Sequence, residues 1–321
     1  MPIVSGLYRF PVKGLSPQSM SSVTVAAGQP FPMDRIFALA RPDTSINSKN
    51  PIWAKKSKFV MLMADQQLAE VQTEVDLDTL EMTIKKNNEL LLKLDLANQS
   101  GQMALESFIQ NLIPSLNQSP NFIQSLDGHF MDKPGNLISL INLETIRMIE
   151  KKWDAKINPL RFRANIYIDN AEPWSEFNWV GKDISVGGAV FYVDSRNSRC
   201  GATNVNPENG KRDLNIPGSL RRTFGHKDFG VYLVAKSNAC VSIGDYINIP
   251  DTPTIVIAQS SFQEPSLNSF ICQGCYFIYD EKVGCAFSGI KPGTKFGEIQ
   301  KSWLCPDCGA NKLSFEKFHL N

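Results

Sequence analysis

The stretch CQGC at positions 272–275 is followed, after 29 residues, by CPDC at positions 305–308. Each CxxC turn can present two thiolates, and four thiolates form a tetrahedral site for iron or zinc. Four of the seven cysteines therefore form two CxxC pairs within the last 50 residues, a distribution that favours a metal site over disulfides. The predicted metal ligands are Cys272, Cys275, Cys305 and Cys308.

The residues between and around the two pairs favour iron. Tyr279-Asp280 follows the first pair, GIKPGTKF occupies 289–296, Trp303 precedes the second pair, and Phe315 follows it. Together with Phe277, these residues resemble the rubredoxin family over 270–318. The resemblance implies one iron ion that transfers single electrons, with zinc as a possible substitute. A nucleic-acid-binding zinc ribbon would have clustered Lys and Arg, whereas 270–321 has six Lys, no Arg and five acids.

Upstream of this segment the chain is predicted to be mainly β-structure. Short apolar runs at 3–12, 22–31 and 35–41 alternate with turn residues, and an alternating pattern over 80–94 around Asn87-Asn88 predicts a hairpin. Helical spacing predicts a helix over 105–112, a second one after an N-cap at Asn142, and a short one near 217–224. A segment rich in Pro, Ser and Gln at 251–269 is expected to be a linker.

Several motifs before position 250 resemble a known family. YRFPVKG at 8–14 and Asp34-Arg35 are similar to motifs of the MOSC N-terminal β-barrel. RFRANI at 161–166 and SRC at 198–200 are similar to motifs of the MOSC domain, as are Phe229-Gly230 and the IGD at 243–245. The resemblance implies a mainly β, α+β architecture with a MOSC N-terminal β-barrel (1–100), a MOSC domain (101–250), a linker (251–269) and a rubredoxin-like knuckle domain (270–321).

This resemblance also implies a molybdenum cofactor (molybdopterin) shared by the barrel and the MOSC domain. Cys200 is expected to be the catalytic residue and the molybdenum ligand, because a thiolate binds metal and neighbouring Arg side chains favour the thiolate. Arg and Lys would bind the pterin phosphate by charge-assisted hydrogen bonds. Gly14 stands where the family commonly has Ser and can offer a backbone contact alone. The predicted cofactor-binding residues are Lys13, Gly14, Arg35, Asn142, Arg163, Ser198, Arg199 and Cys200.

The resemblance implies a reductase of N-hydroxylated compounds (N–OH or N-oxide) that receives electrons from an upstream reductase through the iron. A different hypothesis makes the chain a carrier of molybdenum cofactor or of sulfur, with Cys200 bearing a persulfide. The iron domain favours the reductase, since sulfur carriage needs no one-electron relay. A zinc-ribbon interaction protein without catalysis is a third alternative, and an iron tetrathiolate would distinguish itself by its red colour.

The apolar loop VGCAFS at 283–288 replaces a segment that is commonly acidic in rubredoxins. Exposed apolar side chains mark contact sites, so this loop is predicted to dock on the MOSC domain. Tyr276 stands where rubredoxins have Gly, so the backbone there either tolerates a side chain or is shifted slightly.

Composition excludes some partners. The formal net charge is +1, with 33 Lys+Arg against 32 Asp+Glu, so a nucleic acid or an anionic membrane is not an expected partner and any basic site must be local. The N-terminal residues lack the pattern of a signal peptide, and no apolar run reaches spanning length. We therefore expect a cytoplasmic protein.

Overall fold

The computed structural model describes residues 1–42, 44, 46–47, 51–125, 130–249, 266, 268–306 and 309–318. The strands are β1 Ile3–Arg9, β2 Gln18–Met20, β3 Ser22–Val25, β4 Phe37–Ala40, β5 Gln72–Val75, β6 Glu81–Lys86, β7 Glu89–Asp95, β8 Asn121–Gln124, β9 Ile138–Asn142, β10 Ile166–Asp169, β11 Asp183–Val186, β12 Ala189–Ser198, β13 Asp228–Ala235, β14 Ala239–Ser242, β15 Ile247–Asn248, β16 Ser269–Cys272, β17 Ile278–Asp280 and β18 Phe315–Lys317. The α-helices are α1 Gln99–Leu112, α2 Leu143–Trp153 and α3 Ile216–Phe224.

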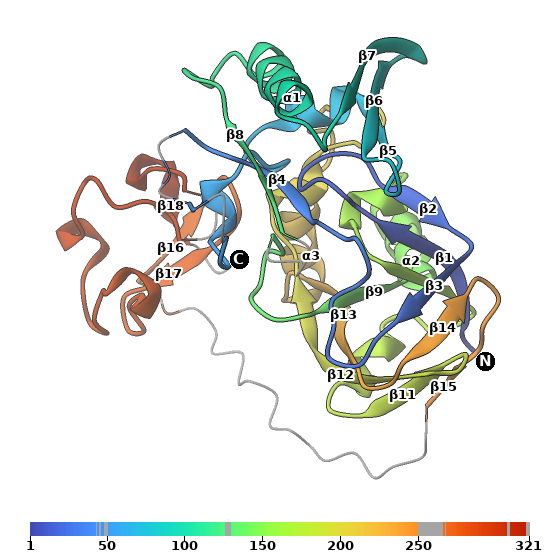
Figure 1. Cartoon of the computed structure of the whole chain (residues 1–321). Helices are drawn as coiled ribbons and strands as arrows, with labels where there is room; N and C mark the ends of the chain where they lie inside the picture. The colour runs from blue at the N-terminus through green and yellow to red at the C-terminus, as the bar shows by residue number, and fades with distance from the viewer. Residues whose placement is uncertain are drawn as a thin grey trace.

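One eight-stranded sheet joins the beginning of the chain to its middle (Figure 1). Its strand order is β15-β11-β12-β13-β9-β10-β1-β2. The N-terminal strand β1 is antiparallel to β10, with Leu7 opposite Ile166, and β10 is parallel to β9. A second contact between distant segments pairs β3 with β14. The first strands of the chain therefore fold together with the strands that follow residue 138.

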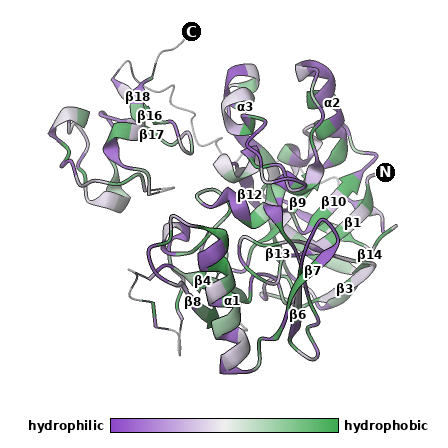
Figure 2. Cartoon of the chain, turned by 90° about the horizontal axis from the view of Figure 1, so that it is seen from above, coloured by the Kyte–Doolittle hydropathy of each residue, from purple (hydrophilic) through white to green (hydrophobic). Residues whose placement is uncertain are grey.

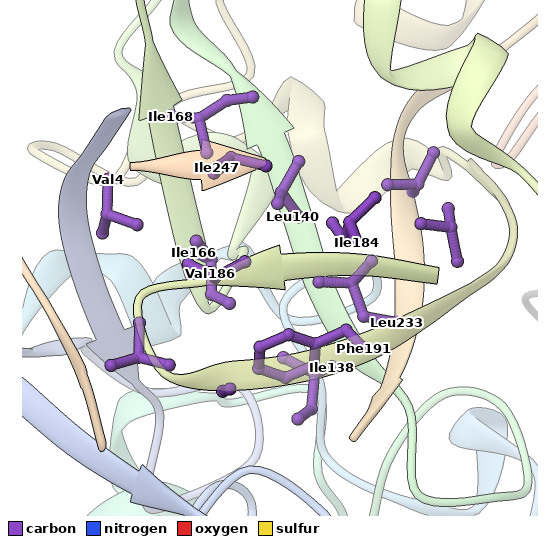
Figure 3. Packing of buried hydrophobic residues seen from close by; sticks show 14 of the residues in the cluster. Val4, Ile138, Leu140, Ile166, Ile168, Ile184, Val186, Phe191, Leu233 and Ile247 are labelled. Atoms are coloured by element: carbon purple, nitrogen blue, oxygen red, sulfur yellow. The ribbon is translucent and has the colours of Figure 1, made fainter. Parts of the chain in front are cut away.

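Aliphatic side chains from the inner face of this sheet form the largest core (Figure 3). Leu140, Ile166 and Leu233 are fully buried on neighbouring strands, and Phe191 and Val186 extend the cluster along β12 and β11. The alternating buried and exposed residues of β12 place one face of that strand in the core, as its period of two requires. This packing holds β12 rigid, and the Cys200 segment follows directly from it.

A second core lies on the barrel side of the molecule, where β4 pairs with β8, β5 to β7 form a sheet, and α1 packs against them. The predicted hairpin is confirmed, because Asn87 and Asn88 connect β6 and β7 with positive φ angles of 51° and 67°. Asn tolerates this left-handed conformation well, which explains the tight two-residue turn. The predicted helix is also confirmed as α1, which Asn98 caps by accepting a hydrogen bond from the Gly101 amide.

Helices α2 and α3 lie together on the face of the large sheet that is opposite to the aliphatic core (Figure 2). Asn142 caps α2 and Asn215 caps α3, each accepting a backbone N–H bond. Ile146 and Leu220 bury the apolar faces of the two helices in one cluster with Phe162. Both predicted helices are therefore present. None of the helices in the described part of the chain has the length and apolar character that a membrane crossing requires.

The C-terminal segment, drawn in orange and red in Figure 1, forms a third, smaller core, to which Met61 and Met63 also contribute. Its three-stranded sheet has the order β17-β16-β18. Packed aromatic rings fill it: Phe270 stacks on Phe296 at 4.1 Å between centroids, and Trp303 contacts Phe315 at 5.2 Å. Most of the predicted linker, 251–265 and 267, lies outside the described residues. The predicted mainly β, α+β class is confirmed.

Candidate cofactor cavity and metal centre

A cavity of about 510 Å³ opens where the barrel side, the large sheet and the C-terminal segment meet. Basic side chains far outnumber acidic ones in its lining, although the whole chain is nearly neutral. The basic site is therefore local, as the composition requires. Of the predicted cofactor residues, the cavity is lined by Lys13, Gly14, Arg35, Arg163, Ser198, Arg199 and Cys200.

Lys13 is 5% exposed, and its ammonium donates to the carbonyl of Phe130 at 2.8 Å and to the carboxylate of Asp132 at 2.5 Å. Burial lowers the pKa of Lys13, while Asp132 opposes that shift. Burial alone would raise the pKa of Asp132, but Lys13 and Lys56 lower it well below its usual range. Asp132 therefore stays ionised and fixes the position of the Lys13 side chain.

Three predicted cofactor residues have left-handed backbone conformations. The φ angles are 88° at Gly14, 51° at Arg35 and 50° at Arg163. A β-carbon on Gly14 would lie 2.9 Å from Leu68 Cδ1, the end of a side chain that can move, so the positive φ is the main reason for glycine at this position. Such backbone strain in residues other than glycine is concentrated at functional sites.

Arg35 and Arg163 lie on the ring of Phe10, with guanidinium carbons 4.7 Å and 4.2 Å from its centroid. Arg35 pairs with the buried carboxylate of Asp34 and donates to the carbonyl of Arg163 at 2.9 Å. Arg163 donates to the carbonyl of Leu15 at 2.7 Å through Nη1, whereas its buried Nη2 has no partner among the residues that the structure describes. Burial and then the neighbouring Arg35 lower the pKa of Arg163. An anion bound here would supply the missing acceptor and relieve the repulsion.

Arg35 and Arg163 are therefore suited to bind the anionic phosphate of a pterin cofactor. A buried guanidinium nitrogen without an acceptor, beside a second guanidinium, is suited to a phosphate group.

Cys200 lies two residues after strand β12, which ends at Ser198, and it is the N-cap of a short 3-10 turn, Gly201–Asn204. Its thiol is partly exposed, lines the cavity and is not in a disulfide. The carbonyl of Cys200 accepts from the Thr203 amide at 3.1 Å and from the Thr203 hydroxyl at 2.9 Å. The turn therefore holds the thiol in the cavity.

Two predictions about cofactor contacts are changed by the structure. Arg199 directs its guanidinium to backbone carbonyls, donating to Phe229 at 2.8 Å and to Phe162 at 2.8 Å. Its polar atoms brace the Cys200 segment, so it contributes charge and support to the cavity. Asn142 does not line the cavity: it is fully buried, caps α2 and donates to Glu176 at 3.2 Å.

Sequence reasoning did not identify several lining residues, among them Trp53, Met61, Met63, Asp132 and Tyr232. Asp132 and Trp53 lie in irregular segments without a motif, so their position depends on tertiary packing. Tyr232 lies on β13 in a run that reads as an ordinary core strand. Burial raises the pKa of Tyr232, so its phenol is protonated at neutral pH.

The C-terminal segment carries the second candidate centre. The buried sulfurs of Cys272, Cys275 and Cys305 lie within 4.8 Å of one another, and those of Cys275 and Cys305 are 3.5 Å apart. Metal–sulfur bonds of about 2.3 Å in a tetrahedron require sulfurs roughly 3.8 Å apart. The geometry therefore fits a tetrathiolate iron ion, and the fourth predicted ligand, Cys308, lies outside the described residues.

The metal centre lies next to the cavity. Met61, Met63 and Cys200 belong to the same apolar cluster as Cys272 and Cys275. A β-carbon on Gly201 would lie 2.5 Å from the carbonyl oxygen of Gly274, so the first cysteine turn touches the Cys200 segment. Phe277 and Pro306 complete the cavity lining from the C-terminal side.

The prediction that the loop at 283–288 docks on the MOSC domain is not supported. Val283 is 55% exposed, and Cys285 is buried in the core of its own domain. The contacts are made by the cysteine turns, because these turns carry the small residues and the carbonyl that permit a close backbone approach.

Comparison with known proteins agrees with this division. Family models match the MOSC N-terminal beta barrel domain over residues 1–114, the MOSC domain over 127–248 and rubredoxin over 269–315. Rubredoxin-2 of Rhodococcus erythropolis is 53% identical over 52 residues, which are 16% of this chain and 82% of that protein. The rubredoxin of Acinetobacter baylyi is 46% identical over 54 residues, or 17% of this chain and 100% of that protein.

Among solved structures, the YUAD protein from Bacillus subtilis is similar with a TM-score of 0.36 and 14% identity, covering 77% of this chain and 94% of that one. The matched ranges and the two centres lead to one assignment: this chain is a MOSC-domain protein, with a MOSC N-terminal beta barrel domain and a C-terminal rubredoxin domain that belongs to the rubredoxin family.

Proposed function

We propose that this protein is a cytoplasmic molybdenum-cofactor reductase of N-hydroxylated compounds, with electrons entering through its own rubredoxin domain from an upstream reductase. The observation that carries the proposal is the contact between the first cysteine turn and the Cys200 segment. It brings a one-electron centre directly beside the predicted molybdenum ligand. A carrier of cofactor or sulfur does not need a one-electron centre beside Cys200.

The residues divide the work of such a reductase. Arg163, supported by Arg35, would bind the pterin phosphate, and Cys200 would hold the molybdenum. When bound, the cofactor supplies the two-electron removal of an oxygen atom from the substrate. Trp53 and Met131 add apolar walls that exclude water and pack the body of the substrate.

Tyr232 is suited to orient the substrate. Its phenol lies in the lining and keeps its proton at neutral pH, because burial raises its pKa. When the side-chain amide of Asn197 is turned so that both its oxygen and its nitrogen have partners, the nitrogen donates to Tyr232 Oη at 3.0 Å, and the phenol hydrogen is then available for another acceptor. We assign to it a hydrogen bond to the oxygen of the N–OH group.

The experiment is metal analysis of protein from a molybdenum-replete host, followed by turnover of a panel of hydroxylamines, amidoximes and N-oxides. We expect molybdenum and iron together, and substrate reduction that is lost in Cys200→Ala and retained in Cys240→Ala, a matched change at an exposed cysteine. Full activity in Cys200→Ala would contradict the proposal. Bound molybdenum without turnover of any compound, with release of the cofactor to an acceptor, would favour the carrier.

A further inference from the structure

The two cysteine turns of the rubredoxin domain share one backbone arrangement. In the first, the amide of Tyr276 donates to the carbonyl of Cys272 at 2.8 Å, and in the second the amide of Gly309 donates to the carbonyl of Cys305 at 2.8 Å. Tyr276 and Gly309 both have left-handed backbones, with φ angles of 62° and 76°. The same structural position is thus filled by tyrosine in one turn and by glycine in the other.

A left-handed conformation costs free energy for every residue except glycine, and bulky residues rarely adopt it. A tyrosine at this position therefore needs a contact that compensates for the cost. The side chain of Tyr276 makes that contact outside its own domain, where its phenol interacts with the side chain of Asn215. Asn215 is the N-cap of α3 in the MOSC domain.

A second contact between the two domains lies beside Tyr276. The backbone of Gly201 meets the carbonyl of Gly274, and a β-carbon on Gly201 would lie 2.5 Å from that oxygen. The neighbour is backbone that the cysteine turn holds fixed, so an added methyl group would have to push the two segments apart. Gly201 does not have a positive φ, so alanine fits its backbone and its requirement for glycine is spatial.

Arg212 holds the MOSC side of this contact in place. Its guanidinium donates to the carbonyl of Gly201 at 3.2 Å and to the carbonyl of Met63 at 2.5 Å. Met63 packs in turn in the cluster that contains Cys272 and Cys275. One side chain thus ties the Cys200 segment and the barrel segment into a single surface for the rubredoxin domain.

We propose that Tyr276 and Gly201 are positioning residues that seat the first cysteine turn on the Cys200 segment, and that this seated state is the one in which electrons pass from the rubredoxin domain to the cavity. The electron-transfer part of this inference rests on the proposed function. Since Phe277 and Pro306 line the cavity, seating also completes the wall around the substrate.

The test compares Tyr276→Gly and Gly201→Ala with two matched controls. Tyr276→Gly relieves the backbone strain at a positive φ but removes the contact with α3. Its control, Asn88→Gly, relieves the same kind of strain at φ 67° in the remote hairpin. Gly201→Ala adds a methyl group at the contact, and Gly297→Ala adds one in the rubredoxin domain where no atom lies within 4 Å of the new carbon.

The first measurement needs no turnover. In iron-loaded, full-length protein from molybdenum-free medium, the rate at which a bulky maleimide modifies Cys200 is followed by peptide mass mapping. We expect labelling about tenfold faster in Tyr276→Gly and Gly201→Ala than in the wild type, with wild-type rates in both controls. The iron absorbance should be retained in all variants. Wild-type labelling rates in both test variants would contradict the positioning role of Tyr276 and Gly201.

The second measurement follows electron transfer in molybdenum-loaded protein by stopped-flow reoxidation of the reduced iron after substrate is added. Tyr276→Gly should slow this step about tenfold, which is more than it slows turnover with a small artificial reductant. Tyr276→Phe, which keeps the ring, should show a smaller loss. If labelling is altered but no compound is ever reduced, the positioning role of Tyr276 and Gly201 holds and the proposed function is wrong. If reduction proceeds and electron transfer in Tyr276→Gly is normal, the proposed function holds and the positioning role is wrong.

Discussion

The metal centre and the cofactor cavity are built in opposite ways. The described metal ligands come from two short turns, and each turn is fixed by hydrogen bonds to its own neighbours. The cavity takes Gly14, Arg35, Arg163 and Cys200 from four distant segments, which the shared sheet and the barrel bring together. Loss of a cysteine ligand should therefore remove the metal centre and leave the cavity residues in place, whereas a change in the packing beneath the cavity should affect both the fold and the site.

The largest expected effect separates the two centres. Cys305→Ala removes a buried iron ligand, so we expect complete loss of the iron absorbance and of turnover with the physiological donor. The cavity does not depend on this thiol, so a small reductant that acts directly at the cavity should still support reduction. Equal loss with both donors would show that the rubredoxin domain is structural.

Glu176, a buried acid that contacts the helix cap Asn142, allows the stability of the fold to be changed without a change at the metal centre. Burial raises the pKa of Glu176 to about 7. The folded state then holds its proton more tightly than the unfolded chain, so this stability is fully present below pH 4.5, the ordinary pKa, and is lost as the pH rises through about 7. Glu176→Gln should raise the free energy of unfolding by about 3 kcal/mol at pH 8 and by little at pH 4.

Urea titrations of Glu176→Gln and wild type at the two pH values measure this difference. An equal effect of the substitution at pH 4 and pH 8 would contradict the assignment of a buried, protonated carboxyl. The iron absorbance should be the same in both proteins.

Arg163→Asn tests the cavity side of the comparison. Asn tolerates the left-handed backbone at this position but lacks the charge, and a hydrogen bond to a charged group contributes about 1.5–3 kcal/mol. We expect the bound cofactor to dissociate at least about tenfold more readily. The ratio of molybdenum to iron in dialysed protein measures the loss, and an unchanged ratio would remove Arg163 from the phosphate site.

The smallest effect is expected at the loop that the sequence wrongly selected for docking. Val283 is 55% exposed, so Val283→Asp should change stability by less than about 0.5 kcal/mol and leave electron transfer unchanged. Slower transfer in this variant, measured by stopped-flow iron reoxidation, would show that the loop takes part in docking after all.

The same contrast explains what the sequence could predict. The cysteine pairs, the hairpin at Asn87-Asn88 and the cap at Asn142 are local features, and local physics determines them. The use of a side chain is not local: Asn142 was expected at the cofactor but caps a helix and contacts Glu176.

Long-range contacts decide the remaining cases. Arg199 was expected to bind the cofactor, but the carbonyls of Phe162 and Phe229 take its donors, and no sequence pattern shows where those carbonyls will lie. The contact between Gly201 and Gly274 joins residues 73 positions apart, and it too depends on tertiary structure.

The central claim is that the rubredoxin domain passes electrons to the Cys200 cavity of its own chain. The most direct test reduces the iron in molybdenum-loaded protein, adds an N-hydroxylated substrate and follows iron reoxidation at several protein concentrations. The account predicts a rate that is independent of protein concentration and that disappears in Cys200→Ala. A rate that rises in proportion to protein concentration, or that persists in Cys200→Ala, would contradict it.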